Sequence, residues 1–297
     1  RDDVESRGLG DVYKRQTYFG SMIMANDMAL ITFLPLGYFV LSRTEKKEYM
    51  AFVFIMQNVA ANLGGMLTPF GNPQNLYLYS RYSIPNAEFL KIMFPPFAVA
   101  LVLIVACCMF VKKEPAEIKD DVFYTPDKPK TIIYLVLFAL SVCSVLRVFP
   151  FYIGIGIAAL GVLIFDRKAF LTVNYPLLLT FCAFFVFSGN MSRIDAVHRL
   201  IGGLLEKNTL LVSVASCQII SNVPTATLLC RFTENYAPLL VGVNIGGLGT
   251  PIASLASLIT LGKFRSTGEK TGKYLLGFLL INFSFLIVLV ILEFIIL

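Results

Sequence analysis

Charged residues are scarce in this chain, and their scarcity excludes an ordinary soluble domain. Asp, Glu, Lys and Arg together make up 15% of the 297 residues, against about 25% in soluble domains. Hydrophobic residues make up 57%, and the mean hydropathy is +0.74. The composition predicts a protein surrounded by lipid. The net charge of +6 is explained by Lys and Arg in cytoplasmic loops rather than by nucleic-acid binding.

Residues that build catalytic and metal centres are also few or scattered. His198 is the only histidine, and its charged neighbours are typical of a solvated interfacial face. The six cysteines lie in apolar runs without metal-ligand spacing, which is typical of small buried side chains. The sequence contains no nucleophile–base pair, phosphate-binding loop or zinc-ligand spacing. We therefore expect neither an enzyme nor a cofactor.

The first sixteen residues differ from the rest of the chain. Residues 1–16 hold eight charged residues and no membrane pattern, and they abut an apolar segment at Thr17 without a transition. We expect them to be a non-native segment on a chain that lacks its true N-terminal part. A short polar cytoplasmic tail is the alternative.

Apolar segments close to the length of a membrane span, about 20 residues, recur along the chain. They lie at 18–41, 50–80, 89–111, 131–146, 151–165, 171–188, 210–230, 237–261 and 274–297. We expect a multi-pass all-α protein of the cell membrane, with a first repeat at 17–111, a cytoplasmic linker at 112–130, connecting helices at 131–170 and a second repeat at 171–297. Glu293, near the end of the last segment, is expected at the membrane interface.

The most informative motif occurs twice. Asn62-Leu-Gly-Gly-Met-Leu-Thr-Pro69 returns 182 positions later as Asn244-Ile-Gly-Gly-Leu-Gly-Thr-Pro251. Glycine and proline inside an apolar stretch break a membrane helix. The freed carbonyl groups can coordinate a cation, and the N-terminus of the following half-helix can face an anion. Neutral ligands are added by Asn62, Thr68, Asn72, Asn75, Asn244, Thr250, Ser254 and Ser257. The alternative is a pair of kinks packed through small residues.

Two other apolar segments carry polar residues near their middle. Asn26 and Asp27 interrupt 18–41, while Ser221 and Asn222, followed by Thr225, interrupt 210–230. Asp27 stands out because an intramembrane carboxylate is costly and usually functional. It can bind Na⁺, carry a coupling proton or pair with a distant cation. As an alternative, it caps the second half-helix of a hairpin.

Loop charges predict the direction of each segment. If 112–130 is cytoplasmic, the basic cluster at 263–273 is also cytoplasmic only when 210–230 is a re-entrant hairpin. The same reading makes 18–41 a hairpin that opens inside. Each half then consists of a hairpin, a broken span and a span in opposite orientation, which is an inverted-topology repeat. The basic residues of 189–208 fall outside, where an interfacial amphipathic helix can hold them.

These motifs resemble the ion transporter superfamily, which groups citrate and dicarboxylate permeases, arsenite permeases and certain sodium–proton antiporters. Ser221-Asn222-Val-Pro is similar to the Ser-Asn-Thr hairpin tip of divalent anion/sodium symporters. The segment 64–75 resembles the Gly-Gly…Thr-Pro-x-Gly-x-Pro-x-Asn segment, and Ala25-Asn-Asp27 resembles the first tip of arsenite permeases. The segment 244–257 is similar to the second broken span. Val223 stands where dicarboxylate carriers have Thr, so the substrate class stays open.

The resemblance implies an elevator-type, homodimeric carrier with one central substrate flanked by two cation sites. It assigns Asn26, Asn62, Gly64, Gly65 and Asn72 to the first cation site or the adjoining substrate wall, and Ser221, Asn222, Asn244, Gly246, Gly247 and Ser254 to the second. Na⁺ is expected at Asn26, Asp27, Asn62, Ser221, Asn222 and Asn244. The leading expectation is a secondary transporter in the lipid bilayer that moves a small anion, such as a carboxylate, with Na⁺ or H⁺. Arsenite efflux, Na⁺/H⁺ exchange through Asp27, a channel and a membrane scaffold are the alternatives.

Overall fold

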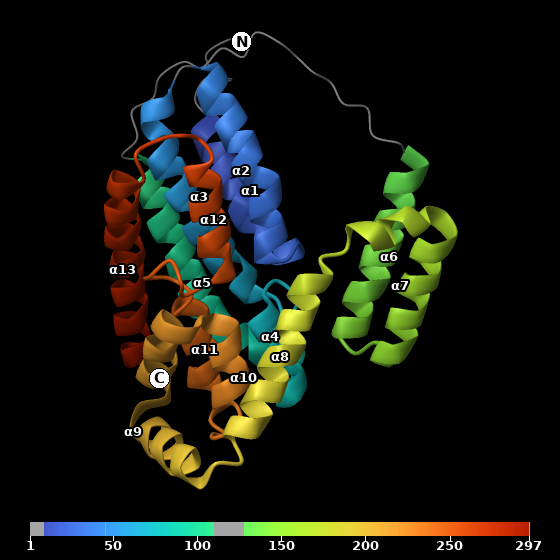
Figure 1. Ribbon diagram of the computed structural model, residues 1–297, viewed down its shortest axis with the longest axis vertical. Helices are drawn as coiled ribbons and strands as arrows, with labels where there is room; N and C mark the ends of the chain where they lie inside the picture. Colours follow the sequence, from blue (N-terminus) through green and yellow to red (C-terminus); the bar gives the residue numbers. More distant parts are fainter. Residues whose placement is uncertain (1–8, 45, 110–127, 297) are drawn as a thin grey trace. The chain divides into compact units, whose positions relative to one another are not determined.

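The computed structural model describes residues 9–44, 46–109 and 128–296, and within these ranges every regular element is a helix (Figure 1). The elements are α1 (Leu9–Ile23), α2 (Asn26–Arg43), η1 (Lys47–Tyr49), α3 (Met50–Gly64), η2 (Gly65–Leu67), α4 (Pro73–Arg81), α5 (Asn86–Met109), α6 (Lys128–Val145), α7 (Phe151–Asp166), η3 (Arg167–Thr172), α8 (Tyr175–Met191), α9 (Asp195–Ile220), α10 (Asn222–Leu229), α11 (Tyr236–Ile245), α12 (Leu255–Arg265) and α13 (Thr271–Ile296). They belong to two compact units, residues 1–118 with 187–297 and residues 119–186.

Several helical runs in the described ranges are long and apolar enough to cross a membrane. Four of them are Lys47–Leu67, Asn86–Met109, Asp195–Ile220 and Thr271–Ile296. A helix pair, Phe151–Thr172 with Tyr175–Met191, meets the same criteria as one span bent by 81°. The prediction of an all-α, multi-pass membrane protein is confirmed.

Two predicted segments fall partly outside the described residues. Most of the polar linker, 112–127, and residues 1–8 of the N-terminal segment lie there. Helix α1 begins at Leu9, so the rest of that segment is continuous with the first apolar helix.

Four interruptions in the helices position the site in the first unit. The first tip (24–25) separates α1 from α2, and the second tip (Ser221) separates α9 from α10. The first break (65–72) separates α3 from α4, and the second break (246–254) separates α11 from α12. All four lie where the sequence predicted a hairpin tip or a broken span.

The same backbone geometry restarts the helix after each break. Asn72 (φ −136°, ψ 142°) and Ser254 (φ −147°, ψ 152°) are both extended and lie 182 positions apart. Pro73 is the first residue of α4, where its missing N–H needs no partner. Ser254 Oγ instead caps α12 by accepting the Ser257 N–H at 3.1 Å. The two breaks are therefore equivalent in backbone but differ in side chain.

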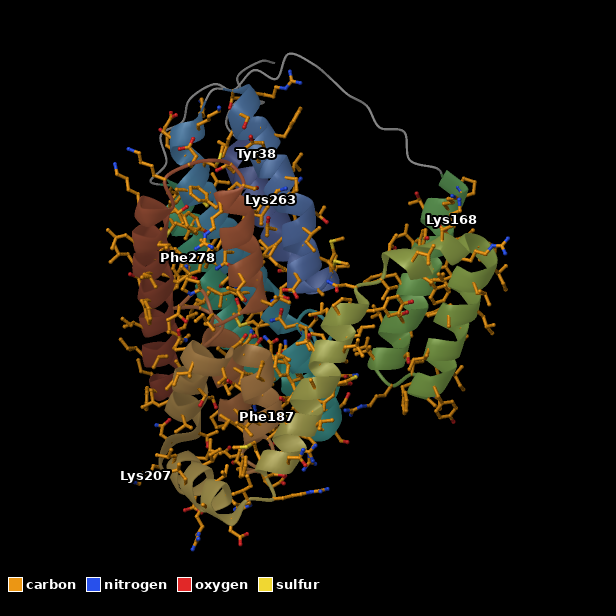
Figure 2. The ribbon with its side chains drawn as sticks, in the orientation of Figure 1. Tyr38, Lys168, Phe187, Lys207, Lys263 and Phe278 are labelled. Carbon is orange, nitrogen blue, oxygen red and sulfur yellow. The ribbon has the colours of Figure 1, made fainter. Side chains whose placement is uncertain are left out.

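Helices from the two halves of the sequence pack against each other inside the first unit. Helix α12 packs against α2 and α3, and helices α10 and α11 pack against α4. A buried cluster formed by α2, α3, α12 and α13 includes Phe54, Phe264 and Phe278, the last of which is labelled in Figure 2. In the same cluster, the rings of Tyr274 and Phe264 are stacked with centroids 4.0 Å apart. Lipid is as apolar as these side chains, so van der Waals packing rather than escape from water holds the helices together.

Helix α13 buries polar groups along the face that packs inward. Its buried residues include Phe278, Asn282, Leu289 and Glu293, which follow one another at helical spacing. Glu293 is only 2% exposed. The sequence placed Glu293 near the end of the last span, and in the structure its side chain is buried within the protein, on the same face of α13 as Phe278 and Leu289.

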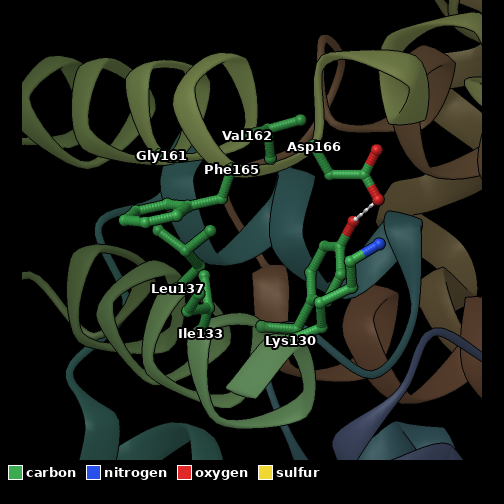
Figure 3. A pocket seen from close by; sticks show the side chains of 8 residues that line it. Lys130, Ile133, Leu137, Gly161, Val162, Phe165 and Asp166 are labelled. Atoms are coloured by element: carbon green, nitrogen blue, oxygen red, sulfur yellow. Dashed lines mark hydrogen bonds between the residues drawn. The ribbon is translucent and has the colours of Figure 1, made fainter. Parts of the chain in front are cut away.

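The second unit contains α6, α7, η3 and the first part of α8. Helices α6 and α7 approach closely at Gly161, where a Cβ would lie 2.5 Å from Leu137 Cδ2. A small hollow between them is bordered by Lys130 and Asp166, and Tyr134 Oη donates to Asp166 Oδ2 at 2.9 Å (Figure 3). None of the predicted site residues lines this hollow.

Candidate functional site

Each hairpin tip is hydrogen-bonded to the break of its own half. In the first half, the Asn26 N–H donates to Gly71 O at 3.0 Å, and Thr68 Oγ1 donates to Met22 O at 2.7 Å. Interrupted helices leave backbone donors and acceptors at their ends, and these bonds satisfy some of them. The Asn26 side chain is 3% exposed, so the first tip is buried against the first break.

The second half repeats both contacts. The Asn222 N–H donates to Ala253 O at 2.9 Å, and Thr250 Oγ1 donates to Gln218 O at 3.2 Å. Both break residues lie 182 positions after their counterparts in the first half. In each half, the tip carbonyl lies four residues before the tip asparagine. The repeat in the sequence is therefore also a repeat of tertiary contacts.

The two tips use the same side-chain cap but differ in backbone strain. Asn26 Oδ1 accepts the Asp27 N–H at 2.8 Å, and Asn222 Oδ1 accepts the Val223 N–H at 2.9 Å. Ser221, however, has φ 72° and ψ 159°, a conformation that costs a non-glycine residue about 1–3 kcal/mol. Strain of this kind persists where surrounding structure enforces it, and it is frequent at functional sites.

A side-chain amide caps the open carbonyl groups of the first break. Asn75 Nδ2 lies 3.3, 3.1 and 3.2 Å from the carbonyl oxygens of Gly65, Met66 and Thr68. The sequence singled out Asn75 as a direct ligand. In the structure its amide nitrogen lies on the backbone carbonyl groups of the break.

Gln218 performs the same task in the second break, and the sequence reading missed it. Its Nε2 donates to Gly246 O and Leu248 O, both at 2.9 Å, while its Oε1 accepts the Thr250 N–H at 2.9 Å. Gly249 has φ 106° and leaves room for this amide, because a Cβ there would lie 2.3 Å from Gln218 Oε1. The sequence did contain a signal for this role, because Gln218 is an amide side chain in an apolar helix, four residues before the tip asparagine.

Asn244, the first residue of the second motif copy, is hydrogen-bonded by the last residue of the first break and by the helix that follows it. Its Oδ1 accepts from Asn72 Nδ2 at 3.0 Å and from Gln74 Nε2 at 3.4 Å. Its Nδ2 donates to Asn75 Oδ1 at 2.6 Å. Four buried amides thus connect the two halves, and Gln74 was not among the predicted site residues.

Asn62, the first residue of the first copy, has a different environment. Its Nδ2 donates to Asn58 O at 3.0 Å and Asn58 Oδ1 at 3.3 Å, one turn back along α3. Asn58 Nδ2 in turn donates to Asn282 Oδ1 of α13 at 3.4 Å. The orientation of Asn62 is fixed by these bonds, and its Oδ1 points away from them.

Three of the buried oxygens that lack a donor belong to amides at the breaks. Among the described residues, Asn62 Oδ1, Asn72 Oδ1 and Gln74 Oε1 accept no hydrogen bond, although each side chain is at most 2% exposed. Such groups in a folded protein call for a partner, which can be an ion or a water molecule. Neutral carbonyl oxygens are suitable ligands for an alkali-metal ion in a membrane.

Side chains from both halves of the sequence also lie around Gly247. A Cβ there would lie 3.0 Å from Asn222 Nδ2 and 3.4 Å from Asn62 Oδ1. Gly64 and Gly246 permit close helix contacts: a Cβ would lie 2.2 Å from Tyr18 O at Gly64 and 3.0 Å from Cys217 Sγ at Gly246. The close backbone approach that the motif glycines permit is therefore used in two ways, for helix contact at Gly64 and Gly246 and for side chains of both halves at Gly247.

The remaining predicted residues lie near the site with other partners. Thr225 Oγ1 donates to Ser221 O at 2.7 Å, and Ser254 Oγ pairs with Ser257 Oγ at 2.8 Å. Asp27 is half-buried in the first turn of α2. Within the described part of the chain, no hydrogen bond or ion pair engages its carboxylate. The structure thus brings the asparagines of both motif copies together but leaves Asp27 beside the first tip.

Comparison with known proteins agrees with this architecture. Residues 17–240 match the family CitMHS, described as citrate transporter. An uncharacterized transporter of Methanocaldococcus jannaschii is 36% identical over 277 residues, covering 92% of this chain and 76% of that protein. The Escherichia coli inner membrane protein YbiR is 31% identical over 247 residues, covering 81% of this chain and 65% of that protein. The chain is therefore a membrane transporter that belongs to the citrate transporter family of the ion transporter superfamily.

Proposed function

We propose that the protein is a secondary active carrier that moves a small anion, such as citrate or a dicarboxylate, together with Na⁺ or H⁺. The observation that carries the proposal is the buried junction of the two breaks, where amide donors and unpaired carbonyl oxygens occur side by side. A site for an anion and a cation together needs both kinds of group. The junction offers both without a fixed charge of its own.

The anion would be held by N–H groups. Asn222 is 2% exposed, and no described residue accepts a hydrogen bond from its Nδ2, so this donor can serve a carboxylate. Helices α4 and α12 begin at the breaks, and a helix N-terminus favours a negative charge. Bringing an anion into a membrane is costly, so a cation bound beside it would lower that cost.

The cation would be held by neutral oxygens, chiefly Asn62 Oδ1. Because binding both ions leaves a smaller net charge in the membrane, the pair would cross more easily than either ion alone. We further propose that the two halves run through the membrane in opposite directions, as the loop charges predict, and that the carrier acts as a homodimer in the cell membrane. The coupling ion is the only cofactor in this account.

Exchange of Na⁺ for H⁺ through Asp27 is the second candidate, with arsenite efflux as the related alternative. It is favoured by the half-buried carboxylate of Asp27, which has no partner among the described residues. A carboxylate that binds either a proton or Na⁺ would suffice for exchange. The amide donors at the two breaks would then have no anion to bind. This contrast favours the anion carrier.

The test is uptake into proteoliposomes that contain the purified protein. Radiolabelled citrate, succinate and arsenite are offered in parallel under imposed Na⁺ or H⁺ gradients, with Asn235→Ala as a control at an exposed loop position. We expect saturable, gradient-dependent uptake of a carboxylate, and loss of that uptake in Asn222→Ala. Proton release driven by Na⁺, with no uptake of either carboxylate, would favour exchange instead. Conduction that does not saturate would indicate a channel, and no flux of any kind would indicate a scaffold.

A further inference from the structure

We propose that Glu293 is a proton-binding site separate from the breaks and tips, and that the proton it holds makes uptake depend on pH. Glu293 belongs to α13, the last helix of the described chain. The inference rests on the proposed function and adds to it a proton that controls the conformation of the carrier.

The side chain of Glu293 is buried without a partner for its Oε1. It is 2% exposed, and among the described residues it is the only Asp, Glu, Lys, Arg or His that is buried. Its Oε1 accepts no hydrogen bond from any described residue. A buried carboxylate whose charge is not compensated is costly in a protein, and more so in a membrane. Binding a proton removes the charge and most of that cost.

The helices that pack against α13 offer no side-chain cation in place of the proton. Helix α13 contacts α3, α5 and α11, and α3 and α11 contain no Asp, Glu, Lys, Arg or His. Helix α5 carries Glu88 and Lys91. Lys91 is exposed, and Glu88 Oε1 accepts a hydrogen bond from the Tyr236 hydroxyl of α11. Cys107 and Cys108, also in α5, can carry no positive charge.

The other charged groups near α13 lie towards its beginning. Helices α2 and α12 meet α13 in the buried cluster that contains Tyr274 and Phe278. About 22 Å of helix separates Phe278 from Glu293. The titratable residues of these three helices, apart from Glu293, are Asp27, Tyr38, Arg43, Lys263, Arg265, Lys273 and Tyr274. The surroundings of Glu293 therefore favour the neutral carboxyl group.

The buried face of α13 around Glu293 suits a proton rather than a metal ion. The buried residues that precede Glu293 are Phe285, Leu286 and Leu289, whose side chains bring no oxygen. A metal ion in a protein takes several ligands, whereas a proton needs one carboxylate oxygen. Asn282 is the nearest buried polar residue of α13, about three turns away, and it accepts a hydrogen bond from Asn58. Glu293 is thus separate from the amides of the breaks.

The position of Glu293 in α13 allows the proton to enter and leave. Glu293 lies within one turn of the end of α13 at Ile296, next to the chain end marked C in Figure 1. In the orientation that the loop charges predict, this end faces outside. A small movement there can bring the carboxyl group into water. Conformations that bury Glu293 hold a proton and those that expose it can release one, so pH shifts the balance between them.

Infrared spectroscopy of the purified full chain tests for the proton directly. A protonated carboxyl group has a C=O stretching band that a carboxylate lacks. Subtracting the spectrum of Glu293→Gln from that of the unmodified protein at neutral pH should leave this band, and the band should shift in deuterium oxide. Asp27→Asn, the matched control in another apolar helix, should keep the band. Carboxylate bands in its place would overturn the inference.

A second measurement needs no substitution at Glu293. If Glu293→Gln fails to fold, as size-exclusion chromatography would show, the unmodified protein is labelled with carbon-13 in its glutamates. Glu293 is the only buried glutamate among the described residues, so a protonated, labelled carboxyl band at neutral pH is assigned to it. Absence of that band would equally overturn the inference.

Uptake into proteoliposomes tests the consequence for transport. Initial rates of carboxylate uptake by the unmodified protein and by Glu293→Gln are compared over a series of external pH values, with Asn235→Ala as the control. The substrate ionises equally in both assays, so the ratio of the two rates reports on the protein. This ratio should change with pH by up to about tenfold per unit, the limit for one proton, because glutamine cannot ionise.

The outcomes separate this inference from the proposed function. Carboxylate uptake with a rate ratio that stays constant over the pH series would overturn the inference and leave the carrier standing. A protonated Glu293 in a protein that takes up no carboxylate under any gradient would refute the proposed function and leave the proton site.

Discussion

Asn244 Nδ2 donates a hydrogen bond to Asn75 Oδ1 at 2.6 Å, which joins two residues 169 positions apart in the sequence. The same Asn75 amide caps three carbonyl oxygens of the first break through its nitrogen. One side chain thus holds the first break in shape and attaches it to the second half. If transport needs both halves in this arrangement, it needs the Asn75 side chain that connects them.

Asn75→Ala should destabilise the protein by about 1–3 kcal/mol, because it leaves buried donors and acceptors without partners. The measurement is thermal unfolding of the purified variant in detergent. Gln218→Ala removes the corresponding amide of the second break and should have a similar effect. An unfolding temperature equal to that of the unmodified protein in both variants would contradict the role assigned to these amides.

Gly65→Ala and Gly247→Ala should have different effects, the first on folding and the second on transport. At Gly65 a Cβ would lie 2.3 Å from a buried amide oxygen and 2.9 Å from a backbone oxygen, so the variant should fold poorly. At Gly247 the nearest atoms lie at 3.0, 3.2 and 3.4 Å, so a small shift of the neighbouring side chains would accommodate the methyl group, and the variant should fold but lose uptake. Size-exclusion chromatography reports folding and the proteoliposome assay reports uptake.

Gly262→Ala is the matched control for both variants, because Gly262 lies inside α12 with no atom within 4 Å of its Cβ position. It should be stabilising by about 0.5–1 kcal/mol, as expected for glycine replaced by alanine in a helix. If Gly247→Ala behaved like Gly262→Ala in uptake, the space beside Gly247 would not be a binding site.

Ser221→Gly should relieve the strain at the second tip. Glycine adopts φ 72° and ψ 159° without penalty, so the variant should be at least as stable as the unmodified protein, whereas Ser221→Val should be less stable by about 1–3 kcal/mol. Thermal unfolding measures both. Equal stability of the glycine and valine variants would show that the tip relaxes without the strain described here.

Asp27→Asn should change the cation dependence of uptake if the carboxylate takes part in coupling. Removing the charge eliminates both proton carriage and charge-assisted binding of Na⁺, while the amide can still occupy the first turn of α2. Initial uptake rates are measured across a series of Na⁺ concentrations and pH values. An unchanged dependence on both would exclude Asp27 from coupling and leave it as a helix-end residue.

The positions of the breaks and tips could be predicted from the sequence, because glycine, proline and polar residues inside apolar segments act locally on the helix. Partners across the junction could not be predicted in the same way. The bonds from Asn72 and Gln74 to Asn244 span 172 and 170 positions and depend on how the halves pack. Periodicity alone also did not predict the burial of Glu293, because α13 is apolar over most of its length and its inward face depends on the neighbouring helices.

Gln218 and Asn75 show a further limit of reading a site from residue types. Both are amides next to a break, and their chemistry suits a ligand as well as a backbone cap. Only the geometry separates the two uses, since Asn75 and Gln218 direct their nitrogens at the protein's own carbonyl groups. Asn62 has the same chemistry, but its oxygen has no protein partner.

The most direct test of a coupled carrier is accumulation against a concentration gradient. Proteoliposomes are loaded with the transported carboxylate at the same concentration inside and outside, and only a Na⁺ or H⁺ gradient is imposed. The account predicts net movement of the carboxylate down the cation gradient, reversal when that gradient is reversed, and no movement with Asn222→Ala. Coupling would be contradicted if the unmodified protein showed saturable uptake of the carboxylate, yet its concentrations inside and outside stayed equal under both gradients.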